Sequence, residues 1–558
     1  MHSCRFTPST RPTRPHRVRR TTATALSAAL TTALLTAAPL AVPSPAAAVG
    51  VTASITAAAA PTLRFVDIPG SNSVVLKGNV YAPGDGAARH PLVVMPASWS
   101  LNDLEYLAQA RQLADAGYVV VSYTPRGFWG SGGRIEVAGP PDVADLSEVI
   151  DWALANTAAD PDRIGLTGIS YGAGISLLGA AFDHRVKTVA ALSGWGDLVD
   201  SLYSDETQHL QSAATLDLLG YLTGRPGDEL QQMLTDFFGG DQPKEDTVKA
   251  WAEVRSPATY VDRINANGAS VLLANSWGDS IFPPNQLADF FERLTGPKRL
   301  ELRPGDHATA EATGLFGLPN DVWTDTHRWL DHYLMGAANG IDHEQPVHLQ
   351  PQLQDRYENY PSWHAVSSST RTLPLGGRDW LGTGGLGNAD TGWHTTIATN
   401  ADSGADGGLI FLSNLAEQFL KIPPLVFVPL LPHSVSAVWQ SSTYSSDQRV
   451  RGIVRAHLGV VPDDDRGSLV AYLYDVDPLG VGRLITHAPY TFVNRTAGNR
   501  FSADFALQAT AYDVPAGHRL ALVVDTVDPL YITHNDPGTT LTFDSPAGDP
   551  SWISVPLK

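Results

Sequence analysis

Two patterns of apolar residues divide this chain of 558 residues. From about residue 62 to residue 343, short apolar runs alternate with stretches of helical periodicity. Runs typical of buried strands lie at 92–95, 119–123, 164–167, 188–192, 271–274 and 299–302, and helical stretches include 104–116, 143–156 and 321–334. Strands that alternate with helices predict a mostly parallel sheet with helices on both faces.

A part of this first half lacks strand-like runs. Residues 197–262 contain helical patterns, such as 206–219 and 228–238, with no strand between them. We therefore expect a helical cap inserted into a sheet domain that occupies residues 49–350.

The second half, residues 351–558, has a different pattern. Its strand-like runs, separated by turn clusters rich in Asp, Gly and Pro, lie at 453–458, 469–476, 483–487, 500–507, 519–525 and 552–557. This spacing predicts an antiparallel all-β sandwich. The apolar stretch 419–432 holds four prolines, which exclude a membrane-spanning helix. We expect this stretch to cover a surface between the two domains.

The first 48 residues have the order of an export signal. Six arginines are followed by a run of mainly Ala, Leu and Thr at 23–42, and then by three alanines at 46–48 that suit a signal peptidase. The run is weakly apolar and is interrupted by Pro39, which argues against a membrane anchor. We expect a secreted protein, exported by the Sec route or, given the Arg pair at 19–20, by the twin-arginine route.

Charge and cysteine content narrow the possible partners and cofactors. The formal net charge is −19, and it becomes −25 when residues 1–48 with their six arginines are removed. A surface this acidic repels phosphates and anionic lipids, so we expect no nucleic acid partner and no membrane partner after signal removal. Cys4, the one cysteine, lies in the signal, so the mature chain has no disulfide or cysteine metal ligand. We expect no metal or other cofactor, because the acidic run 463–465 lacks the ligand spacing of a calcium site.

One motif points to covalent catalysis. The sequence Gly-Ile-Ser-Tyr-Gly at 168–172 directly follows the strand 164–167 and precedes a helix of small residues at 174–181. A G-x-S-x-G sequence between a strand and a helix is typical of a nucleophile elbow, in which the serine occupies a strained turn. Ser170 then lies at a helix N-terminus, where free N–H groups stabilise negative charge. We predict that Ser170 is a catalytic nucleophile.

A serine nucleophile needs a histidine base and an acid, which follow the serine in that fold in the order acid, then histidine. Asp279 comes after the strand 271–274, and His307 comes after the strand 299–302. Both therefore lie at the edge of the sheet that carries Ser170. The histidines that compete with His307 for this role are His327 and His332, which lie on the helix 321–334, and His343, which lies beyond it. Asp306 is a poor choice of acid, because the neighbour of a histidine rarely reaches its Nδ1 in line.

With these motifs, the chain resembles the α/β-hydrolases grouped with X-Pro dipeptidyl-peptidases and the cocaine esterase type (CocE/NonD). The resemblance spans nearly the whole mature chain. The motifs that carry it are YTPRG at 123–127, GSGG at 130–133, Asp145 with VIDW at 149–152, GISYG at 168–172, GD at 278–279, GDH at 305–307, YDVD at 474–477 and PAGHRL at 515–520. The resemblance implies an α/β-hydrolase domain followed by a jelly roll of the galactose-binding-like type.

The family also implies a mechanism. Ser170 would attack a carbonyl carbon, His307 would take the serine proton, and Asp279 would orient and stabilise the imidazole. The backbone N–H of Tyr171 would form one side of the oxyanion hole. Several family members supply the second donor from a Tyr, which the loop 95–100 lacks. Trp99 is nearest the matching position, so the resemblance implies that the second donor is either its indole N–H or a backbone N–H nearby. The alternative role for Trp99 is that of an aromatic residue packed in the pocket wall.

Three functions remain open from the sequence. The first is an exopeptidase that releases N-terminal dipeptides ending in proline, which needs a carboxylate for the substrate ammonium group. The cap offers Asp200, Asp205 and Glu206 for that contact. The second is an esterase or amidase of the cocaine-esterase type that acts on small acyl esters. The third is a non-catalytic protein that binds glycan or cell wall through the jelly roll. The sequence leaves the oligomeric state open.

Overall fold

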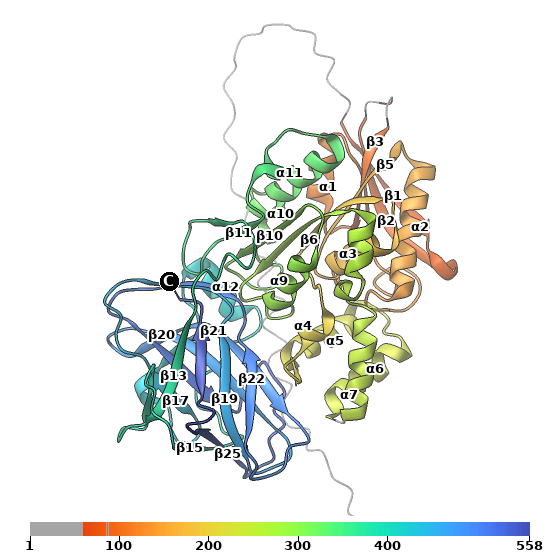
Figure 1. Cartoon of the computed structure of the whole chain (residues 1–558). Coiled ribbons are helices and arrows are strands. Elements are labelled where there is room, and N and C mark those ends of the chain that lie inside the picture. The colour runs from red at the N-terminus through yellow and green to blue at the C-terminus, as the bar shows by residue number, and fades with distance from the viewer. Residues whose placement is uncertain (1–59, 85, 87–88, 241, 558) are drawn as a thin grey trace, which may run out of the picture. The chain divides into compact units, whose positions relative to one another are not determined.

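The computed structural model describes residues 60–84, 86, 89–240 and 242–557 (Figure 1). The predicted export signal, including Cys4, lies outside these described residues. Within them, no helix combines the length and the apolar character needed to cross a bilayer.

The first half is built on a ten-stranded, mostly parallel sheet (Figure 1). In sheet order, its strands are β1 (Thr62–Pro69), β2 (Val75–Ala82), β4 (Val119–Tyr123), β3 (His90–Pro96), β5 (Ala159–Ile169), β6 (Val186–Leu192), β9 (Ser270–Ser276), β10 (Lys298–Arg303), β11 (Val347–Leu349) and β12 (Glu358–Tyr360). The strands from β4 to β11 pair in parallel, while β1, β2 and β12 run antiparallel to their neighbours. The predicted parallel sheet is confirmed.

Helices cover both faces of this sheet. Alternate side chains of β3 enter different cores: Leu92 and Val94 pack on one face, and Val93 and Met95 pack on the other. The first face is covered by α2 (Pro140–Asn156), α3 (Tyr171–Phe182), α8 (Val261–Asn267) and α9 (Pro284–Arg293). The second face is covered by α1 (Leu107–Asp115) and α11 (Asp321–Met335), with the short α10 (Ala312–Leu315) beside α1. Because both faces are buried, the central strands contain apolar runs, such as 92–95 in β3 and 271–274 in β9.

The segment between β6 and β9 is mainly helical. It contains α4 (Leu198–Leu202), β7 (Tyr203–Ser204), β8 (Thr207–Gln208), α5 (Leu210–Thr223), α6 (Asp228–Gly239), α7 (Gln242–Glu253) and a 3-10 turn, η2 (Pro257–Tyr260). The expectation of a helix from residue 206 was wrong at its start. Asp205 and Glu206 have φ values of 48° and 60° and form the turn of the β7–β8 hairpin, so α5 begins only at Leu210.

The second half is rich in β-strands. Its larger strand assembly consists of β13 (Arg371–Arg378), β14 (Thr383–Leu386), β15 (Trp393–Ala398), β16 (Leu425–Phe427), β17 (Ala437–Gln440), β19 (Arg455–Pro462), β20 (Gly467–Val476), β21 (Val481–Phe492), β22 (Phe501–Ala506), β24 (Arg519–Asp525), β25 (Thr540–Ser545) and β26 (Trp552–Val555). A separate ribbon pairs β18 (Gln448–Gly452) with β23 (Thr510–Val514). The pairs are antiparallel except β14 with β17. One core takes residues such as Leu458 and Phe543 from one side of the sandwich and Trp439 and Leu522 from the other.

The apolar stretch 419–432, which the sequence suggested would cover a surface between the domains, reaches that contact at Pro424, which lines a hollow with Trp277 of the first half and Leu484 of the second. It follows α12 (Leu412–Leu420) and contains β16 and a 3-10 turn, η4 (Val428–Leu430). Val426 and Val428 pack on the β-sandwich, but Phe419 is 62% exposed and Leu430 is 78% exposed. The helix α12 therefore presents apolar side chains outward.

Hydrogen bonds join the helical segment to the β-rich half. The N–H of Thr491 donates to the carbonyl of Asp205 at 2.9 Å, and the N–H of Ile532 donates to the carbonyl of Gln208 at 3.0 Å. The hydroxyls of Thr207 and Thr491 lie 2.7 Å apart. The β7–β8 hairpin is thus a bonded contact between the two halves.

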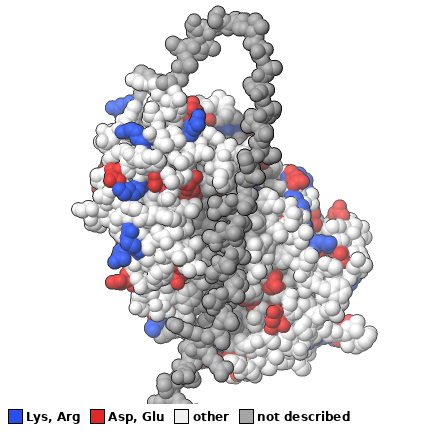
Figure 2. Space-filling view, turned by 180° about the vertical axis from the view of Figure 1, so that it is seen from behind, with Lys and Arg blue, Asp and Glu red and all other residues white. Residues whose placement is uncertain are grey.

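Charged side chains on the face in Figure 2 are interspersed among a majority of uncharged residues. Acidic and basic groups commonly pair in the described residues, as in Arg500 with Asp544 at 2.7 Å and with Asp549 at 2.7 Å. The negative charge of the sequence is therefore not gathered into one patch on the described part of that face.

Candidate active site

Ser170 occupies the strained turn between β5 and α3. Its backbone has φ 56° and ψ −115°, a conformation that non-glycine residues rarely adopt. Close packing around the turn requires the flanking glycines. A Cβ on Gly168 would lie 2.8 Å from the carbonyl carbon of Gly172, and a Cβ on Gly172 would lie 2.1 Å from the carbonyl oxygen of Pro96. The G-x-S-x-G sequence therefore forms the predicted elbow.

Ser170, His307 and Asp279 form a hydrogen-bonded series. The Nε2 of His307 lies 2.8 Å from the Oγ of Ser170, and its Nδ1 lies 3.0 Å from the Oδ2 of Asp279. The carboxylate of Asp279 is fully buried and also accepts the backbone N–H groups of Ile281 and Phe282. These bonds fix the carboxylate beneath the imidazole, as a base-orienting acid requires.

Opposing effects act on the pKa of His307. Burial lowers the pKa, because the charged imidazolium loses solvation, while the charge and hydrogen bond of Asp279 raise it. Asp306 and Glu311 add to the increase, and the resulting pKa lies above the ordinary value. The site thus stabilises the imidazolium that forms when a serine proton is transferred.

The other candidate histidines do not occupy this position. The Nδ1 of His332 lies 3.0 Å from the carbonyl of Ala337 at the end of α11, and His343 is exposed. His327 is largely buried on α11, and burial lowers its pKa. Of these histidines, only His307 is hydrogen-bonded to Ser170.

The proposed role of the Trp99 indole in the oxyanion hole was wrong. Its Nε1–H donates to the carbonyl of Leu216 at 2.9 Å and is therefore occupied. The ring packs edge-on against Phe128 and Tyr171, with centroids 4.9 and 5.3 Å away, as an aromatic residue of the pocket wall. In the described residues, no hydrogen bond engages the backbone N–H of Trp99 or of Tyr171. These two N–H groups are therefore available to a bound group.

Ser170 opens into a cavity between the sheet domain and the helical segment. Most of its wall is apolar, formed by residues such as Trp195, Leu202, Leu234, Phe237, Trp251 and Phe282. Its charged residues are Asp217 and Lys249. The cavity therefore suits an apolar acyl group with few polar contacts.

The three cap carboxylates predicted to bind an ammonium group do not line this cavity. Asp200 and Asp205 line other hollows, and Glu206 pairs with Lys249 at 3.0 Å. The turn at Asp205 and Glu206 directs both residues toward the β-rich half.

Sequence reasoning missed Asp217, which does line the cavity. One of its carboxylate oxygens is buried and has no hydrogen-bond partner within the described residues. The helical period contained a signal, because Asp217 lies four residues after Ala213 and three before Gly220, which also line the cavity. Burial raises the pKa of Asp217 above its ordinary value.

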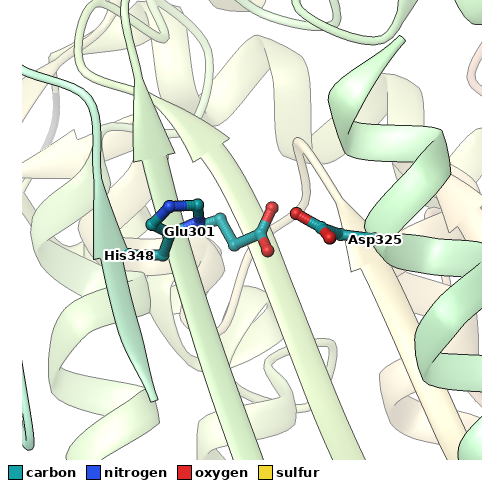
Figure 3. Close-up of side chains that lie close together, drawn as sticks. All are labelled: Glu301, Asp325 and His348. Carbon is teal, nitrogen blue, oxygen red and sulfur yellow. The ribbon is translucent and has the colours of Figure 1, made fainter. Parts of the chain in front are cut away.

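A second group of titratable side chains has the composition of a metal site. Figure 3 shows the carboxylates of Glu301 and Asp325 facing one another, with the ring of His348 nearby. However, Glu301 accepts hydrogen bonds from Arg299 at 2.5 Å and from Arg303 at 2.6 Å. These guanidinium groups already supply the positive charge that a metal ion would bring. Burial and the two arginines lower the pKa of His348 to about 4. We therefore describe this group as a buried ion-pair network.

The serine elbow at the carboxyl edge of a helix-covered parallel sheet defines the class of the protein, the α/β-type serine hydrolases. Residues 72–309 match the family model described as X-Pro dipeptidyl-peptidase (S15 family). Residues 339–549 match the model described as X-Pro dipeptidyl-peptidase C-terminal non-catalytic domain. Together the two models span most of the chain, which belongs to the X-Pro dipeptidyl-peptidase family that they describe.

Individual relatives agree with this family. The chain is 23% identical over 487 residues to a putative Xaa-Pro dipeptidyl-peptidase of Streptomyces avermitilis, covering 77% of this chain and 70% of the relative. It is similar in fold to a CocE/NonD family hydrolase of Staphylococcus aureus, with a TM-score of 0.68 and 14% identity over 89% of this chain and 94% of that one. An α-amino acid ester hydrolase gives a TM-score of 0.67 at 14% identity, over 91% and 98% of the two chains.

Proposed function

We propose that the chain hydrolyses an acyl bond through a Ser170–His307–Asp279 triad and an acyl-enzyme. The continuous hydrogen-bonded series that ends at Ser170 on the wall of the apolar cavity carries this proposal. His307 Nε2 takes the proton as Ser170 Oγ attacks the carbonyl carbon, and Asp279 stabilises the imidazolium. The backbone N–H groups of Tyr171 and Trp99 stabilise the oxyanion.

The remaining steps follow from the same groups. His307 returns its proton to the leaving amine or alcohol as the tetrahedral intermediate collapses to the acyl-enzyme. Water then enters and attacks the acyl carbon while His307 takes one of its protons. His307 returns that proton to the Ser170 oxygen as the second tetrahedral intermediate collapses, which releases the acid and restores Ser170.

The first candidate substrate is a peptide from which an N-terminal dipeptide ending in proline is released. Family models of X-Pro dipeptidyl-peptidases that match both halves of the chain support this candidate. The apolar wall suits a proline ring, and the unpartnered oxygen of Asp217 offers a contact for the substrate ammonium group. The predicted export signal fits an enzyme that meets peptides outside the cell, and we propose secretion on that sequence pattern.

The second candidate substrate is an ester with a bulky apolar acyl group. The almost wholly apolar wall of the cavity favours this candidate, because it offers a peptide backbone few hydrogen-bond partners. The triad is common to both candidates, since acyl specificity is set by the pocket.

A substrate panel separates the two candidates. A fluorophosphonate probe should label the wild-type chain and leave Ser170→Ala unlabelled, which tests the nucleophile. Ala-Pro and Gly-Pro chromogenic amides are then compared with their N-acetylated forms and with short- and medium-chain nitrophenyl esters. A peptidase loses most activity on acetylated amides and loses activity again near pH ~8 as the substrate amine deprotonates. Equal rates on free and acetylated amides would exclude the exopeptidase.

A further inference from the structure

Asp306 connects the two loops that carry the partners of Ser170. Its buried Oδ1 accepts the N–H of Ser280 at 2.9 Å, the hydroxyl of Ser280 at 2.7 Å and the N–H of His307 at 2.6 Å. Ser280 directly follows Asp279 in the sequence. One carboxylate oxygen therefore holds the loop of the acid against the loop of the base.

The other oxygen of Asp306 is bonded by the β-rich half of the chain. Oδ2 accepts the N–H of Phe411 at 2.9 Å and the Nδ2 of Asn414, at the start of α12, at 3.0 Å. The same Nδ2 donates to the carbonyl of Gly278 at 2.6 Å. Both partners are acceptors, which assigns the nitrogen of the Asn414 amide to this position. The two hydrogens of one amide thus contact the residue before Asp279 and the residue before His307.

The surroundings of Asn414 are shaped around its amide. A Cβ on Gly278 would lie 2.5 Å from the Cγ of Asn414, so no larger residue fits there without displacing the amide. Phe411 has φ 64° and ψ −42°, a strained conformation in which its N–H bonds to Asp306.

We infer that Asn414 is a positioning residue for the triad, supplied by the half of the chain whose family model is described as non-catalytic. The inference rests on the proposed triad. Without the Asn414 amide, the carbonyl of Gly278 and the buried Oδ2 of Asp306 each lose a donor, and the two loops lose their common contact. A shift of about 1 Å between Asp279 and His307 is enough to slow catalysis roughly 100-fold.

The first experiment compares Asn414→Ala with Leu415→Ala, whose side chain is on the exposed side of the same helix. The rate of fluorophosphonate labelling reports the activated serine without a bound natural substrate. We expect Asn414→Ala to slow labelling roughly 10- to 100-fold and to lower kcat on a hydrolysed ester similarly, with KM within twofold of wild type. Leu415→Ala should label at the wild-type rate.

A second variant tests the same contact without removing the amide. Gly278→Ala should displace Asn414 and slow labelling, because the three atoms nearest the added methyl group all belong to the Asn414 amide. We therefore expect the double variant to label about as slowly as Asn414→Ala alone. Fully additive effects would overturn the inference. If near-UV circular dichroism shows that Asn414→Ala does not fold, the labelling rate of Gly278→Ala alone tests the inference. Labelling of Gly278→Ala at the wild-type rate would then overturn the positioning role of Asn414.

The inference and the proposed function fail separately. Loss of labelling in Ser170→Ala establishes the nucleophile independently of Asn414. A folded Asn414→Ala that labels within twofold of the wild-type rate then overturns the role of Asn414 and leaves the triad standing. Undiminished labelling in Ser170→Ala would instead overturn the triad and, with it, the positioning role.

Discussion

The imidazole of His307 contacts both Ser170 and Asp279, so its removal should disable the proposed chemistry without unfolding the protein. We predict that His307→Ala lowers kcat by about four to six orders of magnitude, because triad members act as a unit. His327→Ala is the matched control on α11 and should keep most activity. Ester hydrolysis and circular dichroism measure both variants. A folded His307→Ala that stays active, together with a folded His327→Ala that is inactive, would refute the assignment of His307 as the base.

The raised pKa of His307 sets the pH range of activity. Catalysis requires the neutral imidazole, so kcat/KM should rise with pH and reach a plateau above the pKa of the free enzyme. Because Asp279 and the neighbouring carboxylates outweigh burial, the midpoint should lie above ~6.5. A neutral nitrophenyl ester is the proper substrate, since only the enzyme then titrates. A midpoint below pH ~6 would contradict the electrostatics of the site.

The carboxylate of Asp217 provides a test of peptide recognition. If it pairs with a substrate ammonium group, Asp217→Asn should lower kcat/KM for free Ala-Pro amides by about 10- to 100-fold, the cost of a charge-assisted hydrogen bond. Rates on nitrophenyl esters should stay within about twofold. Asp200→Asn, which lies outside the cavity wall, is the matched control. An equal loss on amides and esters would show that Asp217 supports the cavity rather than the amine.

The individual residues differ in how far the sequence reveals them. Ser170, Asp279 and His307 were predicted because each lies in the turn or loop after a strand, and the order of strands along the chain places these loops at one edge of the sheet. The partner of Trp99 was not predictable, since Leu216 lies 117 residues away and competes for the indole N–H through tertiary packing. Asn414 was missed for the same reason, because its contacts with Gly278 and Asp306 join distant segments.

The helix α3 and the strand β3 approach so closely at the elbow that glycine is required. A Cβ at Gly172 would lie 2.1 Å from the carbonyl oxygen of Pro96, a backbone atom that cannot move aside cheaply. We predict that Gly172→Ala lowers the free energy of unfolding by about 1–3 kcal/mol and abolishes fluorophosphonate labelling. Gly239→Ala in α6, where nothing lies within 4 Å of the added Cβ, should leave stability unchanged or slightly raised. Urea unfolding measures both; equal midpoints for the two variants would contradict the close approach.

Buried elements were the easiest to predict from the sequence. The strand at 119–123 has the predicted bounds, because all five residues are buried and it opens with three consecutive valines. Short elements at the contact between the halves were harder. The β7–β8 hairpin has two-residue strands, too short to show a period, and it interrupts a stretch that otherwise has helical propensity. The exposure of individual side chains in 419–432 was also hard to predict, because apolar character alone does not say which side chains face solvent.

The whole chain should unfold as one unit over residues 60–557. The β7–β8 hairpin and the Asn414 contacts tie the β-rich half to both the helical segment and the loops near Ser170. We predict coincident urea transitions for fluorophosphonate labelling, which reports the elbow, and for tryptophan fluorescence, which includes Trp439 in the sandwich core. A cavity-forming variant in the sandwich, Phe543→Ala, should shift both midpoints together. Separate midpoints would show that the halves are energetically independent.

The fit between Gly278 and Asn414 limits how proteins of this architecture can be recombined. Consider a chimera that takes its first half from this chain and its second half from a relative. Its Gly278 loop leaves room for one side chain of the size of Asn414, so the new half must supply an amide at that position. A β-rich half chosen only for its own stability or for a binding property would fold and still leave the hydrolase slow. Exchange boundaries for engineering should therefore keep the segment of Phe411 and Asn414 together with the loops of Gly278 and Asp306.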